Sequence, residues 1–224
     1  MQRLRLTFSR GEELKYISHL DLMRLWQRAL RRAELPLVYS QGFSPHLRIS
    51  LAVPLAVGVT SSRELMDIFL ERRVSPHLFI KKVREQLPRG IDVSEVVEVA
   101  IDSPSLQSQV RSAEYKVTAE TGRGPKEVEA AICSLLASDR LPWQHARDKE
   151  FRKYDLRNLI DDLWLIESCP PEYTIGMILR CDSTGTGRPE QVLSALGFTE
   201  QPKSIHRVKL LLERQAKSAA CRKM

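Results

Sequence analysis

An amphipathic helix with well-marked ends limits the folds that this chain of 224 residues can adopt. Its apolar positions recur at steps of three and four residues and form one buried stripe, which holds Leu22, Met23, Trp26, Ala29, Leu30 and Ala33. Ser18 is placed to cap the first turn, and Asp21 brings a negative charge that suits the positive helix end. Pro36 ends the pattern, because proline lacks an N–H and disfavours helix just before it. The sequence therefore predicts a helix that packs on a core by one face.

Strand patterns surround this helix. Gln2 to Ser9 alternates, with Leu4, Leu6 and Phe8 on one side and Arg3, Arg5 and Thr7 on the other, which predicts a half-buried strand. After Pro36 we expect a short strand in LVYS and a second extended run from Arg48. A loop over 54–62, a strand over 65–71, a helix that begins at Ser75-Pro76 and a strand over 91–101 follow. The order βαββαβ is that of a ferredoxin-like unit.

The second half of the chain repeats this order more loosely. A stretch over 103–112 is rich in Ser and Gln and lacks periodicity, so it is predicted to be a linker. Helices over 125–137 and 188–196 and strands over 114–120, 173–181 and 204–213 then follow, with an insertion near 149–170. The predicted class is α+β, with two tandem ferredoxin-like (βαββαβ) units at 1–102 and 113–213, antiparallel sheets, and a basic tail at 214–224.

Charge and cysteine content narrow the function classes. The net charge is +7, and the first fifty residues hold nine Lys/Arg and four Asp/Glu, which leaves +5 there. A local basic excess favours a polyanion partner, RNA first, although a basic surface that serves only solubility is the alternative.

The four cysteines form no CxxC pair, so we expect no metal and no cofactor; they are Cys133, Cys169, Cys181 and Cys221. Cys133 is expected on a buried helix face. No signal peptide or membrane-length apolar run is found, which favours a cytoplasmic protein without a membrane partner.

A candidate nucleic-acid surface follows the helix. Its cations are expected to meet phosphates, because the guanidinium fork matches phosphate geometry: they are Arg24, Arg28, Arg31, Arg32 and, beyond the loop, Arg48. Tyr39 and Phe43 are candidates for stacking on bases, and Gln41 and Ser44 share the polar QGFSPH loop with them. The alternative is a solvated helix face with its acidic neighbours paired, and aromatic rings that cover the core. Nothing in these residues indicates a preference for DNA.

One constellation is suited to catalysis. His19, Asp21 and His46 include two imidazoles near a basic surface, which is the chemistry of a general acid and base in RNA cleavage. A His/Asp metal site is a second interpretation, and histidines that hold the helix start against the loop are a third. Whether the protein is an enzyme stays open at this point.

The stretch YISHLDLMRLWQRALRRAELPLVYSQGFSPHLRIS, followed by PLAVGV and ELMDIFL, resembles the bacterial radical-SAM-linked domain of unknown function. Members of that family occur alone or joined to the C-terminus of a cobalamin-binding radical SAM protein, and the segments KYDLR and RPEQVL resemble it as well. The family's loop usually reads GFNPHP, so Ser44 and Leu47 depart from its pattern here. The resemblance implies a radical SAM protein as partner. A radical SAM enzyme holds its own iron–sulfur cluster with a CxxxCxxC run, and the widely spaced cysteines of this chain form no such run.

Taken together, these patterns favour an RNA-binding accessory protein in RNA modification or processing, with tRNA or rRNA as partner and a radical SAM protein beside it. A ferredoxin-like enzyme that acts on RNA through His19 and His46 is one alternative. A protein-interaction domain for the radical SAM enzyme, without RNA contact, is the other.

Overall fold

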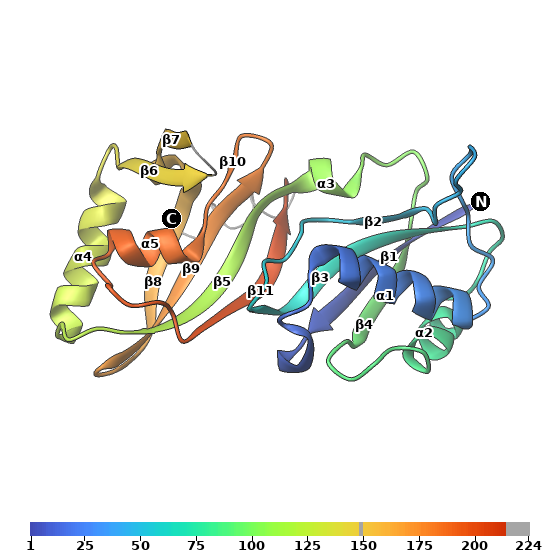
Figure 1. Cartoon of the computed structure of the whole chain (residues 1–224), viewed down its shortest axis with the longest axis horizontal. Coiled ribbons are helices and arrows are strands. Elements are labelled where there is room, and N and C mark those ends of the chain that lie inside the picture. The colour runs from blue at the N-terminus through green and yellow to red at the C-terminus, as the bar shows by residue number, and fades with distance from the viewer. Residues whose placement is uncertain (148–149, 214–224) are drawn as a thin grey trace. The chain divides into compact units, whose positions relative to one another are not determined.

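The computed structural model describes residues 1–147 and 150–213, and the chain divides into two compact units, Met1–Val110 and Arg111–Met224 (Figure 1). The predicted basic tail at 214–224 lies outside the described residues. Within the described part, no helix is long and apolar enough to cross a membrane. Helices stand beside mostly antiparallel strands in both units, so the predicted α+β class is confirmed.

The first unit is a four-stranded sheet with two main helices. Its elements are β1 (Gln2–Arg10), η1 (Glu12–Leu14), α1 (His19–Arg32), β2 (Ile49–Leu51), β3 (Val59–Leu70), α2 (Pro76–Arg84) and β4 (Val93–Val99). The strands lie in the order β2–β3–β1–β4, and neighbours are antiparallel. β1 is central: Leu6 lies opposite Met66 of β3 on one side and Val96 of β4 on the other.

The start of α1 is held as its sequence predicts. The backbone N–H of Asp21 donates to Ser18 Oγ at 3.1 Å, and the Ser18 hydroxyl donates to Asp21 Oδ2 at 2.7 Å. The helix ends at Arg32, before Pro36, and Glu34 takes a φ of 51° in the left-handed region. The chain therefore turns sharply away from the helix, and Figure 1 shows the blue segment that follows α1 looping out before it returns as β2.

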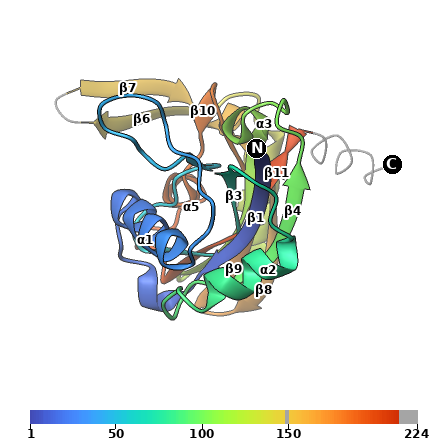
Figure 2. The same cartoon turned by 90° about the vertical axis from the view of Figure 1, so that its right-hand side faces the viewer.

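Both main helices of this unit cover the same face of the sheet (Figure 2). Trp26 and Leu30 of α1 join Phe79 and Val83 of α2 in one core with the inward side chains of β1, β3 and β4. Trp26 is fully buried, and its ring meets Phe8 edge-on at a centroid distance of 4.9 Å. This packing is the reason that α1 presents one fixed face outward.

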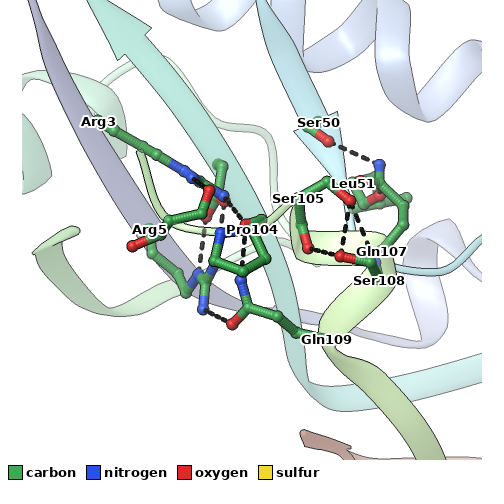
Figure 3. Close-up of polar contacts among 11 residues, drawn as sticks. Arg3, Arg5, Ser50, Leu51, Pro104, Ser105, Gln107, Ser108 and Gln109 are labelled. Atoms are coloured by element: carbon green, nitrogen blue, oxygen red, sulfur yellow. Dashed lines mark hydrogen bonds and ion pairs between the residues drawn. The ribbon is translucent and has the colours of Figure 1, made fainter. Parts of the chain in front are cut away.

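The other face of β1 is buried as well, so the prediction of a half-buried strand is wrong. Arg3 is 3% exposed, and its guanidinium and that of Arg5 both bind the carboxylate of Asp67 on β3. The segment predicted to be a linker covers them: Arg3 donates to the carbonyls of Ser103 at 2.7 Å and Pro104 at 2.9 Å (Figure 3). The alternation itself is present, but a cation can be buried when it is fully paired.

The same covering segment contains α3 (Leu106–Gln109), a short helix that the sequence did not indicate. Its Gln107 side chain donates to Ser50 Oγ at 2.6 Å and to the Leu51 carbonyl at 2.8 Å (Figure 3). Ser105 caps this helix through the N–H of Ser108. Its polar residues thus bind β2 rather than forming a loose connection.

The second unit has a comparable set of elements. They are β5 (Val110–Glu120), α4 (Pro125–Ala137), β6 (Pro142–Arg147), β7 (Glu150–Asp155), η2 (Leu156–Leu159), β8 (Ile160–Cys169), β9 (Glu172–Asp182), β10 (Gly185–Thr186), α5 (Pro189–Ala195) and β11 (Ser204–Leu212). β9 lies between β5 and the pair β8 and β10, and β11 lies on the far side of β5. β6 and β7 form a separate two-stranded hairpin.

Two further expectations differ from the structure. Cys133 is exposed on α4, because the helix buries the neighbouring Ile132 and turns the cysteine outward. The loop expected over 54–62 is partly strand, since β3 already begins at Val59. A run of small and β-branched residues contains no strong signal for either state, and the pairing with β1 decides it.

Candidate nucleic-acid interface

The charges of the first fifty residues separate into an internal and an external group. Arg3 and Arg5 bind Asp67, Arg10 is fully buried, and Lys15 pairs with Glu12 at 2.6 Å. The other five of the nine basic side chains are all exposed, and they are the five predicted cations, Arg24, Arg28, Arg31, Arg32 and Arg48. The surface excess of positive charge is therefore concentrated on α1 and the segment that follows it.

The arginines of α1 have few acidic neighbours. Arg24 forms an ion pair with Asp21 at 3.0 Å, and hydrogen bonds from Ser18 and Arg24 hold the pKa of Asp21 below its usual value. Arg28, Arg31 and Arg32 form no ion pair within the part of the chain that the structure describes. We define the arginine row as Arg24, Arg28, Arg31 and Arg32. From the first to the last it extends about 12 Å along the helix axis.

The polar loop closes a short hairpin beyond the end of α1. Tyr39 and Leu47 form a bridge, and the N–H of Arg48 donates to the Val38 carbonyl at 2.8 Å. The predicted strand at 37–40 is reduced to single bridges of this kind. The loop itself is closed by Ser40, whose N–H donates to the His46 carbonyl while its hydroxyl accepts the N–H of His46. Residues 40–46 are all exposed, which includes the predicted site residues Gln41 and Ser44.

The two aromatic residues of this hairpin face solvent rather than the core. Phe43 is fully exposed in the loop, so the alternative interpretation as a cover for the core does not hold for it. Tyr39 is 39% exposed, and the Arg31 guanidinium lies over its ring at 6.0 Å from the centroid. That contact joins the arginine row to the hairpin.

The side chain of Arg48 packs on the aromatic ring of Phe69. Its guanidinium lies 4.1 Å from the centroid of the Phe69 ring, and Arg3 approaches the same ring at 5.6 Å. The N–H of Phe69 also donates to the Arg48 carbonyl at 3.2 Å. Arg48 is therefore an ordered cation at the edge of the sheet.

The members of the predicted catalytic constellation lie on two different segments. His19 is the first residue of α1, whereas His46 is next to Leu47, which bridges to Tyr39 under Arg31 near the helix end. Twelve residues of helix place His19 about 18 Å from Arg31 along the axis. The joint acid–base role of His19 and His46 stays a prediction. Asp21 lies in the same helical turn as His19, and its carboxylate accepts hydrogen bonds from Ser18 and Arg24. Within the described ranges, no three His, Cys, Asp or Glu side chains gather closely enough to hold a metal ion.

A family model described as "Uncharacterized protein conserved in bacteria (DUF2344)" matches residues 3–189. The chain belongs to this family. The match includes the arginine row, the polar loop and most of the second unit. No curated protein matches the sequence.

The comparison with solved structures shows a similarity of fold and nothing more. A chain from the "Crystal Structure of a Cbf5-Nop10-Gar1 Complex" aligns with a TM-score of 0.50 at 10% identity, over 93% of this chain and 48% of that one. This protein thus spans about half the length of that neighbour. A "putative glycine cleavage system transcriptional repressor" (TM-score 0.26, 12% identity, 93% of this chain and 98% of that one) and "An RAMP protein binding different RNA substrates" (0.18, 7%, 93% and 100%) are too dissimilar to carry an argument.

One feature near the start of α1 escaped the sequence analysis. Tyr16, Leu20 and Val57 are 73%, 64% and 59% exposed, although each is large and apolar. The N–H of Gly58 donates to the Lys15 carbonyl at 2.7 Å, which holds the segment of Val57 against that of Tyr16. The sequence contained one signal of this exposure, because the helical periodicity places Leu20 outside the buried stripe.

Proposed function

We propose that this protein binds RNA and serves as an accessory factor in RNA modification or processing. The observation that carries the proposal is the arginine row, in which Arg28, Arg31 and Arg32 are exposed and form no ion pair among the described residues. Cations in a row along one helix face release counterions when they meet a phosphate backbone. The proposed substrate class is tRNA or rRNA, in the cytoplasm, with no preference for DNA.

The hairpin beyond α1 supports single-stranded RNA in particular. Phe43 presents an entire aromatic ring to solvent, and Tyr39 offers a second ring beneath Arg31. A fully exposed phenyl ring is accessible to a base, and bases stack on such rings without regard to sequence. Gln41 and Ser44 supply amide and hydroxyl groups for base edges or ribose in the same loop.

The fold that we infer for this role is a tandem of two ferredoxin-like units. The strand order β2–β3–β1–β4 and the helices on a single face support it for the first unit. In the second unit, β8, β9, β5 and β11 occur in the corresponding order, with the β6–β7 hairpin inserted after α4. The boundaries at 1–102, 103–112 and 113–213 stay predictions.

The test is fluorescence anisotropy with labelled total tRNA and a ribosomal RNA fragment across a salt series. We expect Arg28→Ala and Arg31→Ala each to weaken binding about tenfold, the effect of losing one charge-assisted phosphate contact. The slope of log K against log salt should also fall by about 0.7 for each lost contact with a single strand. Arg89→Ala is the matched control, because Arg89 is an exposed cation of the same unit that lies after α2. Unchanged affinity in both row variants would refute the assigned surface.

A protein-interaction role is the second candidate, and three exposed apolar side chains near the start of α1, those of Tyr16, Leu20 and Val57, favour it. We propose that they form one apolar patch. We propose a radical SAM enzyme as the partner, which rests on the family resemblance of the sequence. The test is co-purification with that enzyme after nuclease treatment, with Leu20→Ser to disrupt the patch. Binding that survives nuclease and is lost in Leu20→Ser would support this role. Binding that nuclease abolishes would show that RNA mediates the association.

A further inference from the structure

The second unit contains a cavity that the RNA surface does not use. Its volume is about 700 Å³, and all the residues around it come from 153–191. It is formed where β7 runs into η2, opposite the start of α5 and the turn between β9 and β10. Cavities of this size hold small molecules rather than single ions.

Two segments that the sequence analysis noted for their family resemblance, KYDLR and RPEQVL, meet at this cavity. The Tyr154 hydroxyl from the first donates to Gln191 Oε1 from the second at 2.7 Å. Burial raises the pKa of Tyr154, against the opposing effects of the Gln191 hydrogen bond and the positive charge of Arg188. The hydroxyl thus keeps its proton at neutral pH and fixes the width of the cavity between β7 and α5.

The charges around the cavity are mainly positive. Lys153, Arg180 and Arg188 line it, and Asp155 is the single carboxylate among the residues that line it. Asp155 is already engaged, because its Oδ1 accepts the N–H groups of Leu141 at 2.8 Å and Arg157 at 3.0 Å. Arg180 is held by its Nε, which donates to Asp161 Oδ1 at 3.2 Å. Cations from three different segments therefore converge on one space.

Neutral polar groups complete the lining. Thr184 belongs to the turn after β9, Thr186 belongs to β10, and Asn158 belongs to η2. The N–H and hydroxyl of Thr184 both donate to Asp182 Oδ1, which fixes the turn. The sequence STGTG of this turn lacks the lysine of a P-loop. In this fold, the positive charge comes from Lys153, Arg180 and Arg188 instead.

We propose that this cavity binds a phosphorylated small molecule of about the size of a mononucleotide. The lysine and two arginines match the charge and the bidentate geometry of phosphate oxygens, and the threonine, asparagine and glutamine side chains match the hydroxyls of a sugar-like body. Leu159 provides an apolar wall on one side. The volume accommodates such a ligand, whereas inorganic phosphate alone would leave most of it filled with water.

The experiment is isothermal titration calorimetry of the full chain with AMP and with pyrophosphate at low salt. Lys153→Met keeps the length of the side chain and removes the charge, and Lys153 is exposed, so the variant should fold. We expect its affinity for AMP to fall about tenfold, as for a lost charge-assisted contact, while Lys153→Arg retains binding. Lys126→Met, on the exposed side of α4, is the control for a general loss of charge.

Three results would overturn the proposal: no binding of either probe to the wild-type chain, unchanged affinity in Lys153→Met, or an equal loss in Lys126→Met. An RNA titration of the same variants separates this site from the proposed RNA surface. We expect Lys153→Met to bind tRNA like wild type while Arg28→Ala binds it weakly. Loss of tRNA binding in Lys153→Met, without binding of AMP to the wild-type chain, would refute the small-molecule site and assign the cavity to RNA phosphates.

Discussion

Replacement of Asp67 by asparagine is expected to destabilise the first unit severely. The Asp67 side chain is 1% exposed, and its two oxygens accept four N–H groups from Arg3 and Arg5, at 2.6 to 3.1 Å. The side chains of Arg3 and Arg5 are themselves only 4% and 12% exposed. An asparagine side chain would keep the shape but leave two buried guanidinium groups facing each other without a counter-charge.

The magnitude follows from the number of groups left unpaired. Removal of one partner from a buried ion pair costs about 3–5 kcal/mol. Arg3 would keep the Ser103 and Pro104 carbonyls and Arg5 would keep Gln109, so we expect the lower end of that range, about 3 kcal/mol. For a unit of this size, about 3 kcal/mol corresponds to a drop in Tm of roughly 12 °C or more.

The assay is urea unfolding followed by the fluorescence of Trp26, in a background of Trp143→Phe and Trp164→Phe so that it is the one tryptophan. The matched control is Asp102→Asn, an exposed carboxylate of the same unit, which should change the free energy of unfolding by less than about 0.5 kcal/mol. The m-value should stay constant. A loss of less than about 1 kcal/mol in Asp67→Asn would refute the reasoning, because it would mean that the guanidinium groups are hydrated and the network contributes little.

Three further outcomes follow from the structure. Trp26→Ala should cost about 3–5 kcal/mol in urea unfolding, because the fully buried indole leaves a large cavity under α1. The lowered pKa of Asp21 stabilises the fold above the usual value of 3.8, and this contribution is lost as pH falls through the folded-state pKa; Asp21→Asn should flatten the loss of stability measured between neutral and acidic pH. Gly176→Ala would drive a Cβ into the Trp164 indole, so we expect a cost of about 1–3 kcal/mol that Trp164→Ala relieves in a double-mutant cycle.

The sequence was informative where a residue's role is set by its near neighbours. Ser18 caps α1 as predicted, and the buried stripe through Trp26 faces the core. The five cations predicted for the surface are exposed, since nothing in their local pattern required burial.

It was uninformative where a role depends on residues far away in the chain. Arg3 looked like the exposed side of a strand because Pro104, its carbonyl acceptor, lies 101 residues further on. A joint role of His19 and His46 depends on the same kind of long-range contact, because one residue begins α1 and the other lies in the hairpin beyond it, and it stays a prediction. The cavity of the second unit likewise required Tyr154 and Gln191 to meet, and no periodicity reports a contact of that kind.

The central position of β1 has a consequence for synthesis on the ribosome. β1 precedes both of its partners in the chain, because β3 ends at Leu70 and β4 ends at Val99. The Asp67 carboxylate on β3 accepts two of the N–H groups of Arg3, and the two backbone carbonyls that complete its contacts follow only at Ser103 and Pro104. Arg3 therefore reaches its complete set of partners only after the 101 residues that follow it, up to Pro104, have been made. The native contacts of β1 are thus completed only when the end of this unit has been made, and the charges of Arg3 and Arg5 oppose the pairing of β1 with other chains before then.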